Sequence, residues 1–243
     1  MPVFYDIHTL PWSTSCMIQL LFCFFIIPNP CSPANFTQMA IVPYDPSSVF
    51  LTPFQAKERS FEFAGRTLTV FQNWNEVGVA AVVWDAAIVL GRYLEKKAPE
   101  LQGKKVIELG AGTGVAGIVA SFLGGKVTIT DRKMALNVTR MNVEGNLGED
   151  QRTVEIKELE WGQNVASFSP PFEYILGADI VYIEETFPDL LKTLLDLCDR
   201  NSVVLLSCKL RYDRDMRFFK LLSKHFHHEI VLYDKELDIN VYR

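Results

Sequence analysis

The run Lys105-Val-Ile-Glu-Leu-Gly-Ala-Gly-Thr-Gly114 joins a short apolar strand to a turn that holds three glycines. The apolar segment from Val115 to Leu123 follows it with the length and composition of a helix. Glycine lets the backbone turn tightly and approach a ligand that a Cβ atom would exclude. In open α/β sheets, ligands bind beyond the carboxyl ends of the strands, so this turn is the first candidate binding site.

Strands and helices alternate along the rest of the chain. We predict further strands at Lys126–Thr130, Thr153–Lys157, Tyr174–Gly177 and Val203–Cys208, and helices at about Lys133–Gly145, Glu184–Leu197 and Asp213–His225. Short apolar strands separated by helices imply a parallel sheet that is covered on both faces. Glu229–Tyr233 and Asp238–Tyr242 are joined by a short turn and predict an antiparallel hairpin. The expected fold is α/β, with a Rossmann-like seven-stranded sheet that is mostly parallel and ends in this hairpin.

Three regions are expected along the chain. Residues 1–38 contain no Lys or Arg and have an apolar run that is shorter than the roughly 20 residues of a membrane-spanning helix, so we predict a disordered or non-physiological extension. Residues 39–76 form an N-terminal arm, whose alternating segments around Ala64-Gly65-Arg66 predict a short β-hairpin. Residues 77–243 form the main domain, which opens with a helix from Val79 to Leu94.

Composition excludes some partners. The net charge of -5 and the lack of long basic runs argue against a nucleic-acid surface, which needs clustered Lys and Arg. Five cysteines, an odd number without metal-ligand spacing, indicate reduced thiols. We therefore expect a monomer in the cytoplasm, with the nucleus as a second location, that binds no nucleic acid, membrane or metal. The charged segment Arg211-Tyr-Asp-Arg-Asp215 is expected to be a solvated helix end.

Two ligands suit the glycine turn. Gly112-x-Gly114-x-x-Gly117 also matches the dinucleotide pattern of nicotinamide dehydrogenases, which places a pyrophosphate at the start of a helix. Glu108 favours S-adenosylmethionine instead, because a carboxylate before the glycines would repel a pyrophosphate but suits an ammonium and a sulfonium. Asp131 ends the second strand, where a carboxylate accepts hydrogen bonds from ribose hydroxyls of either ligand.

Several blocks of the chain resemble the seven-β-strand protein-lysine methyltransferases. Within that family they are most similar to enzymes that methylate a lysine on heat-shock chaperones of the seventy-kilodalton class. The resemblance runs from about Met39 almost to the end. The matching blocks are Gly78-Val-Ala-Ala-Val-Val-Trp-Asp-Ala-Ala87, Glu108-Leu-Gly-Ala-Gly-Thr-Gly114, Thr128-Ile-Thr-Asp131, Glu158-Leu-Glu-Trp-Gly-Gln-Asn164, Leu176-Gly-Ala-Asp-Ile-Val-Tyr182 and Ile183-Glu-Glu-Thr-Phe187.

The resemblance implies roles for individual residues. Asp179 and Tyr182 match its Asp-x-x-Tyr motif and would hold the substrate lysine, with Asp179 positioning it first and accepting a proton second. The residues implied to contact S-adenosylmethionine are Trp84, Gly110, Ala111, Gly112, Asp131, Trp161 and Ala178, in addition to Glu108. Trp161 would lie against the adenine. For both tryptophans the alternative is core packing.

The expected function is transfer of methyl groups from S-adenosylmethionine to a lysine of a seventy-kilodalton chaperone. Two alternatives stay open. One is a methyltransferase that acts on another protein or on a small molecule. The other is a cofactor-binding module without turnover that docks to the chaperone.

Overall fold

The computed structural model describes residues 52–96, 101–148, 153–163 and 165–243. The predicted extension at residues 1–38 and the first part of the predicted arm, residues 39–51, lie outside these ranges. The described part of the arm begins with the short helix α2, Thr52–Gln55.

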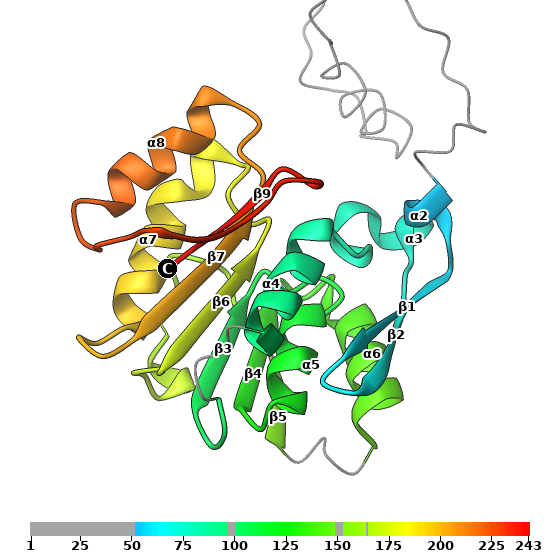
Figure 1. The fold of residues 1–243 in the computed structure, drawn as a ribbon. Helices are drawn as coiled ribbons and strands as arrows, with labels where there is room; N and C mark the ends of the chain where they lie inside the picture. The colour runs from blue at the N-terminus through cyan, green and yellow to red at the C-terminus, as the bar shows by residue number, and fades with distance from the viewer. Residues whose placement is uncertain (1–51, 97–100, 149–152, 164) are drawn as a thin grey trace, which may run out of the picture. The chain divides into compact units, whose positions relative to one another are not determined.

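A seven-stranded sheet forms the centre of the domain, in the order β5-β4-β3-β6-β7-β9-β8 (Figure 1). Its strands are β3 (Lys105–Leu109), β4 (Lys126–Asp131), β5 (Val154–Glu158), β6 (Tyr174–Ala178), β7 (Val203–Cys208), β8 (Ile230–Asp234) and β9 (Ile239–Tyr242). Strands β3 to β7 pair in parallel, while β9 is antiparallel to both β7 and β8. The predicted fold class is therefore confirmed.

The strand order reverses at β3. From β3 the chain moves outward through β4 and β5, and it then returns to the other side of β3 with β6 and β7. Such a reversal opens a crevice beyond the carboxyl ends of the two central strands, here β3 and β6. The glycine turn leaves β3 at that crevice.

Helices cover both faces of the sheet (Figure 1). On one face Val106 and Ile129 pack with α4, α5 and α6, and on the other Ile107 and Ile175 pack with α7 and α8. Successive strand residues point to opposite faces, so both Val106 and Ile107 are buried. The helix bounds are α4 (Asp85–Lys96), α5 (Val115–Phe122), α6 (Leu136–Leu147), α7 (Phe187–Leu197) and α8 (Asp213–Leu222).

The predicted helix from Val79 to Leu94 is wrong in its first six residues. The chain forms the one-turn helix α3 (Trp74–Val77), a 3₁₀ turn (Gly78–Ala81) and an extended residue at Val82 before α4 begins at Asp85. The cause is the buried side chain of Gln72, whose Oε1 accepts the Val83 N–H at 2.8 Å. Because this amide bonds to the arm, it is not available to a continuous helix.

Three other helices differ from prediction at their ends. The helix expected from Glu184 starts as a 3₁₀ turn, and α7 begins at Phe187 with Pro188 in its first turn, where the missing N–H costs nothing. Helix α6 begins three residues later than expected, and α8 ends at Leu222 instead of His225.

The N-terminal hairpin is present as predicted. Strands β1 (Glu58–Phe63) and β2 (Arg66–Phe71) pair antiparallel around Ala64 and Gly65. Both turn residues have positive φ, +52° and +70°, as the two-residue turn of a twisted hairpin requires.

Two asparagines of α6 hold the edge of β2. Asn142 Oδ1 accepts the Phe71 N–H at 2.7 Å and its Nδ2 donates to the Phe71 carbonyl at 3.1 Å. Asn146 makes the same pair of hydrogen bonds with Thr69, at 2.8 and 2.7 Å. Residues four apart on a helix match residues two apart on a strand, so the side-chain amides pair with β2 as a third strand would.

Replacing Asn142 with leucine is expected to destabilise the protein by about 2 kcal/mol, because buried backbone groups of Phe71 and Thr113 lose their partners. Urea unfolding of the full chain would measure this loss. Asn137→Leu, at an exposed position of the same helix, is the control and should change stability by less than about 0.5 kcal/mol. Equal effects of both substitutions would contradict a structural role of the Asn142 amide.

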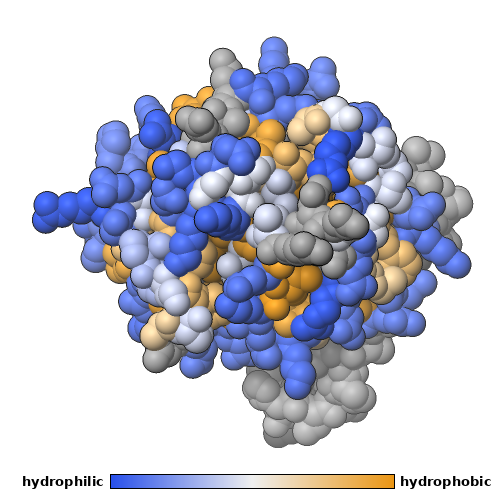
Figure 2. Space-filling view, turned by 90° about the horizontal axis from the view of Figure 1, so that it is seen from below, coloured by the Kyte–Doolittle hydropathy of each residue, from blue (hydrophilic) through white to orange (hydrophobic). Residues whose placement is uncertain are grey.

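Figure 2 views the domain from below, at the end where the strands begin, and shows a mainly hydrophilic face with apolar residues in separate small areas. Within the described ranges, no single helix has the length and apolarity needed to cross a membrane. Only the bent pair Trp74–Ala81 and Asp85–Lys96 meets both criteria when taken together.

Candidate active site

The glycine turn has a backbone that only glycine adopts easily. Gly110, Gly112 and Gly114 have φ values of +58°, +55° and +82°. A Cβ atom on Gly110 would lie 2.9 Å from the Ile180 side chain and 3.2 Å from the ring of Trp161, and one on Gly112 would lie 2.7 Å from the Ala80 carbonyl oxygen. The turn therefore needs glycine for its conformation and for its close packing.

Helix α6 supports this turn from behind. Thr139 Oγ1 donates to the Gly112 carbonyl at 2.7 Å, and Asn142 Nδ2 donates to the Thr113 carbonyl at 3.0 Å. Asn142 also bonds to Phe71, so one buried amide ties the glycine turn to the arm.

Glu108 lies beneath the turn and not at its surface. It is only 1% exposed, and its Oε2 accepts the Gly117 N–H at 2.8 Å. Burial raises the pKa of this carboxyl to about 8, the Gly117 hydrogen bond opposes that rise, and the charge of Asp131 adds to it. The carboxyl fixes the start of α5 from inside. The predicted contact of Glu108 with the cofactor stays a prediction.

Asp131 ends β4 beside the turn, as predicted. Its Oδ2 accepts the Gly112 N–H at 2.7 Å and its Oδ1 accepts the Arg132 N–H at 2.6 Å. Burial raises the pKa of Asp131, although these two hydrogen bonds oppose the rise. The residue is half-buried.

Asp179 follows β6 in a left-handed conformation, with φ +53°. Its N–H donates to the Ser207 carbonyl of β7 at 2.7 Å, which turns the side chain at the strand end. Both carboxylate oxygens accept hydrogen bonds from Arg211, each at 3.1 Å, and the side chain is 10% exposed. This bidentate ion pair corrects the expectation that Arg211 to Asp215 is a solvated helix end.

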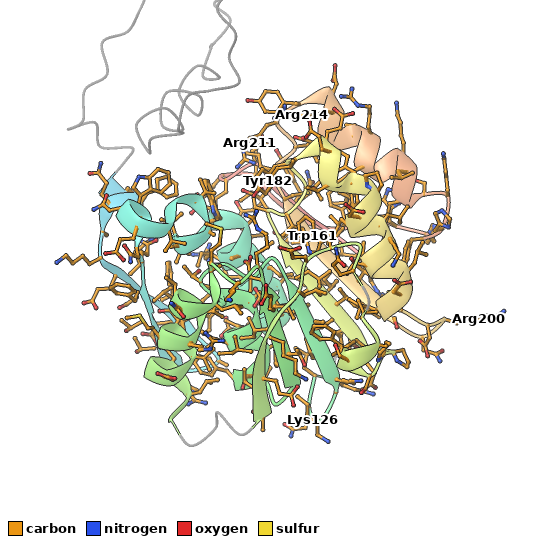
Figure 3. The ribbon with its side chains drawn as sticks, turned by 180° about the vertical axis from the view of Figure 1, so that it is seen from behind. Lys126, Trp161, Tyr182, Arg200, Arg211 and Arg214 are labelled. Carbon is orange, nitrogen blue, oxygen red and sulfur yellow. The ribbon has the colours of Figure 1, made fainter. Side chains whose placement is uncertain are left out.

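Tyr182 lies three residues beyond Asp179 and is 42% exposed. Partial removal from water raises the pKa of its hydroxyl, and the nearby charges of Asp131 and Asp179 raise it further, while Arg132 lowers it. Figure 3 shows Trp161, Tyr182 and Arg211 at one end of the sheet, with Lys126, the first residue of β4, at the other. The predicted residues thus come from the carboxyl ends of different strands.

The two tryptophans differ in their contacts. Trp161 is half-buried, with its ring edge against Gly110. Trp84, also half-buried, donates through Nε1 to the Val79 carbonyl at 2.9 Å and packs on Phe54, with 5.3 Å between the ring centroids. Ala178, the last residue of β6, is half-buried at the strand end.

Comparison with known proteins now assigns the family. A family model described as lysine methyltransferase matches residues 62–225, and the protein N-lysine methyltransferase METTL21A of Mus musculus is 52% identical over 208 residues, 84% of this chain and 95% of that protein. The chain belongs to the lysine methyltransferase family. EEF1A lysine methyltransferase 3 of Mus musculus is another relative, 41% identical over 82% of this chain and 89% of its own length.

Solved structures place this lysine methyltransferase in a wider fold class. The 16S rRNA N2 G1207 methyltransferase of T. thermophilus, in complex with AdoMet and guanosine, matches 76% of this chain with a TM-score of 0.57 and 16% identity. A putative SAM-dependent methyltransferase from Streptococcus mutans matches 77% with a TM-score of 0.55 and 12% identity. This chain covers 49% and 55% of those two proteins, respectively, and the likeness shows the fold.

These findings confirm the predicted enzyme class, a protein-lysine methyltransferase, and its cofactor, S-adenosylmethionine. The residues at the crevice fit that cofactor. The glycines leave room for close approach, the half-buried Asp131 carboxylate offers acceptors for ribose hydroxyls, and the Trp161 ring offers an apolar surface for adenine. The individual contacts with the cofactor remain predictions for Trp84, Glu108, Gly110, Ala111, Gly112, Asp131, Trp161 and Ala178.

Proposed function

We propose that this methyltransferase acts on a lysine of a folded heat-shock chaperone of the seventy-kilodalton class, in the cytoplasm. The observation that carries the proposal is the pairing of a nearly buried Asp179 carboxylate with an exposed Tyr182 ring at the crevice between β3 and β6. A carboxylate near an aromatic ring suits a lysine side chain, because the carboxylate can accept a hydrogen bond from the nitrogen while the ring packs on the apolar stem. The resemblance of the blocks around these residues to chaperone-directed enzymes supports the choice of substrate.

When bound, S-adenosylmethionine supplies a methyl group on a positively charged sulfur, which an amine displaces directly. The protein therefore needs mainly to align the lysine, and alignment alone lowers a barrier by several kcal/mol. In this proposal, Asp179 orients the lysine nitrogen and Tyr182 packs along its methylenes. The lysine must arrive without its proton, at a cost set by a reference pKa of about 10.4.

The name of one relative suggests a second protein as the methyl acceptor. EEF1A lysine methyltransferase 3, at 41% identity, covers the same domain of this chain, so elongation factor 1A is the competing substrate class. The two substrates are both folded proteins, and only direct assay separates them.

The test is methyl transfer from radiolabelled S-adenosylmethionine by the full chain to purified seventy-kilodalton chaperone or to purified elongation factor 1A. We expect label on a lysine of the chaperone and loss of that label in Asp179→Asn and Tyr182→Ala, with cofactor binding by calorimetry kept in both. Label only on elongation factor 1A would overturn the chaperone proposal.

Matched substitutions away from the crevice control for nonspecific damage. Asp196→Asn removes an exposed carboxylate from α7, and Tyr233→Ala removes an exposed aromatic ring from β8 at the edge of the sheet. Both should keep full transfer. If Asp179→Asn and Tyr182→Ala were as active as these controls, the assigned substrate site would be wrong.

A further inference from the structure

Arg211 holds Asp179 in a defined geometry. Its two terminal nitrogens donate to the two carboxylate oxygens, so no carboxylate oxygen is without a cationic partner. A bidentate guanidinium pair of this kind is stronger and more directional than a single ionic contact. A substrate lysine that reaches Asp179 therefore meets an ion pair and not an isolated negative charge.

The structure also holds Arg211 itself in place. Arg211 lies in the loop after β7, where its N–H donates to Asp215 Oδ2 at 2.9 Å, and the Tyr212 N–H donates to the same oxygen at 3.0 Å. Asp215 is buried. Removal from water lowers the pKa of Arg211, but hydrogen bonding and charge from Asp179 outweigh this effect and the net pKa is raised. The guanidinium is therefore a fixed part of the site.

An isolated carboxylate would work against the reaction. An opposite charge within about 4–6 Å favours the ammonium form of lysine and raises its pKa by 1–3 units, whereas a like charge lowers it. Only the neutral amine has the lone pair that attacks the methyl carbon. Arg211 brings a positive charge to the same carboxylate and so opposes the rise.

We propose that Arg211 is a positioning residue that offsets the charge of Asp179, so that the substrate lysine binds there as a neutral amine after its proton has passed to water. The inference rests on the proposed lysine site at Asp179. The Asp179 carboxylate then orients the lysine nitrogen through a hydrogen bond. Asp179 does not take the proton of the lysine, because both of its oxygens already accept hydrogen bonds from Arg211.

Other titratable groups lie near Asp179, Arg211 or Tyr182, and the test leaves their identities unchanged. Arg132, Asp131 and Asp179 influence the pKa of Tyr182, while Asp215 and Cys208 contribute to the raised pKa of Arg211. None of them is changed by a substitution at Arg211, so a change in pH dependence reports the guanidinium.

The experiment compares pH–rate profiles of the wild type, Arg211→Gln and Arg211→Lys on the purified chaperone. In Arg211→Gln we expect the apparent pKa of kcat to rise by roughly one unit, so that kcat at pH 7.5 falls about tenfold. The KM for the chaperone should stay equal or fall, because the ammonium pairs better with a free carboxylate. Arg211→Lys should keep a profile close to that of the wild type.

Arg217→Gln is the matched control. Arg217 makes an even shorter bidentate pair with Glu184, at 2.7 and 2.6 Å, but both side chains are exposed. Its loss should leave the apparent pKa unchanged. A loss of kcat in Arg211→Gln that is equal at every pH would indicate only structural damage and would overturn the inference, as would a profile identical to that of the wild type.

Failure of the substrate proposal is distinguishable from failure of this inference. If the wild type labels elongation factor 1A and not the chaperone, the same profiles are measured on that protein. If the wild type labels neither protein, both proposals are overturned. If the wild type labels either one and the profiles coincide, only the role of Arg211 is wrong.

Discussion

Replacing Gly112 with alanine is expected to weaken S-adenosylmethionine binding at least about 100-fold, a loss of nearly 3 kcal/mol. The added Cβ would lie 2.7 Å from the Ala80 carbonyl oxygen, which belongs to the backbone and cannot rotate away. Alanine at φ +55° adds about 1–2 kcal/mol of strain. The turn must therefore shift and move the Gly112 N–H from Asp131. Calorimetric titration with the cofactor measures the result.

Substitutions at two other glycines distinguish the two causes of this loss, backbone strain and the steric clash with Ala80. Gly148 has a similar φ of +52° but open space around its position, so Gly148→Ala tests strain without a clash. Gly145 lies within α6 with open space and an ordinary helical conformation, so alanine there should be neutral or slightly stabilising. Both controls should bind the cofactor normally. Normal binding by Gly112→Ala would show that the tight approach to Ala80 does not shape the cofactor site.

The sheet was predictable from the sequence because its signals are local. Each parallel strand is a short apolar run followed by a helix-length segment, and the final hairpin has a short turn. The break between Ala81 and Asp85 was not predictable in this way. It depends on the side chain of Gln72, eleven residues before the amide of Val83 that it binds.

The same contrast between local and long-range signals applies to the residues of the site. Asp131, Asp179 and Tyr182 were found because they follow strands whose carboxyl ends meet at the crevice. Arg211 was missed because its partner lies 32 residues away, although it too follows a parallel strand and that position was a usable signal. The orientation of the Glu108 side chain was not predictable. Strand β3 is buried on both faces of the sheet, so its apolar pattern does not indicate toward which face the carboxyl points.

Glu108→Gln is expected to make the protein more stable than the wild type at pH 8 by several kcal/mol, with little difference at pH 4.5. The folded-state pKa of Glu108 is about 8, against an ordinary value of 4.5, chiefly because the carboxyl is buried. Below pH 4.5 the carboxyl is protonated in the folded and the unfolded protein alike. Between pH 4.5 and about 8 only the unfolded protein releases the proton. The free energy of unfolding of the wild type therefore falls by up to about 1.4 kcal/mol per pH unit.

Glutamine keeps an oxygen for the Gly117 N–H but has no proton to release. The free energy of unfolding of Glu108→Gln should therefore lack the pH-dependent loss expected for the wild type. Urea unfolding of both proteins at pH 5, 6, 7 and 8 measures the difference, which should widen steadily with pH. Glu144→Gln, at an exposed position of α6, is the control and should differ from the wild type by a constant amount. A constant difference for Glu108→Gln as well would mean that the folded protein holds Glu108 ionised. The carboxylate would then bind the first turn of α5 as an anion, and burial would not be the dominant influence on its pKa.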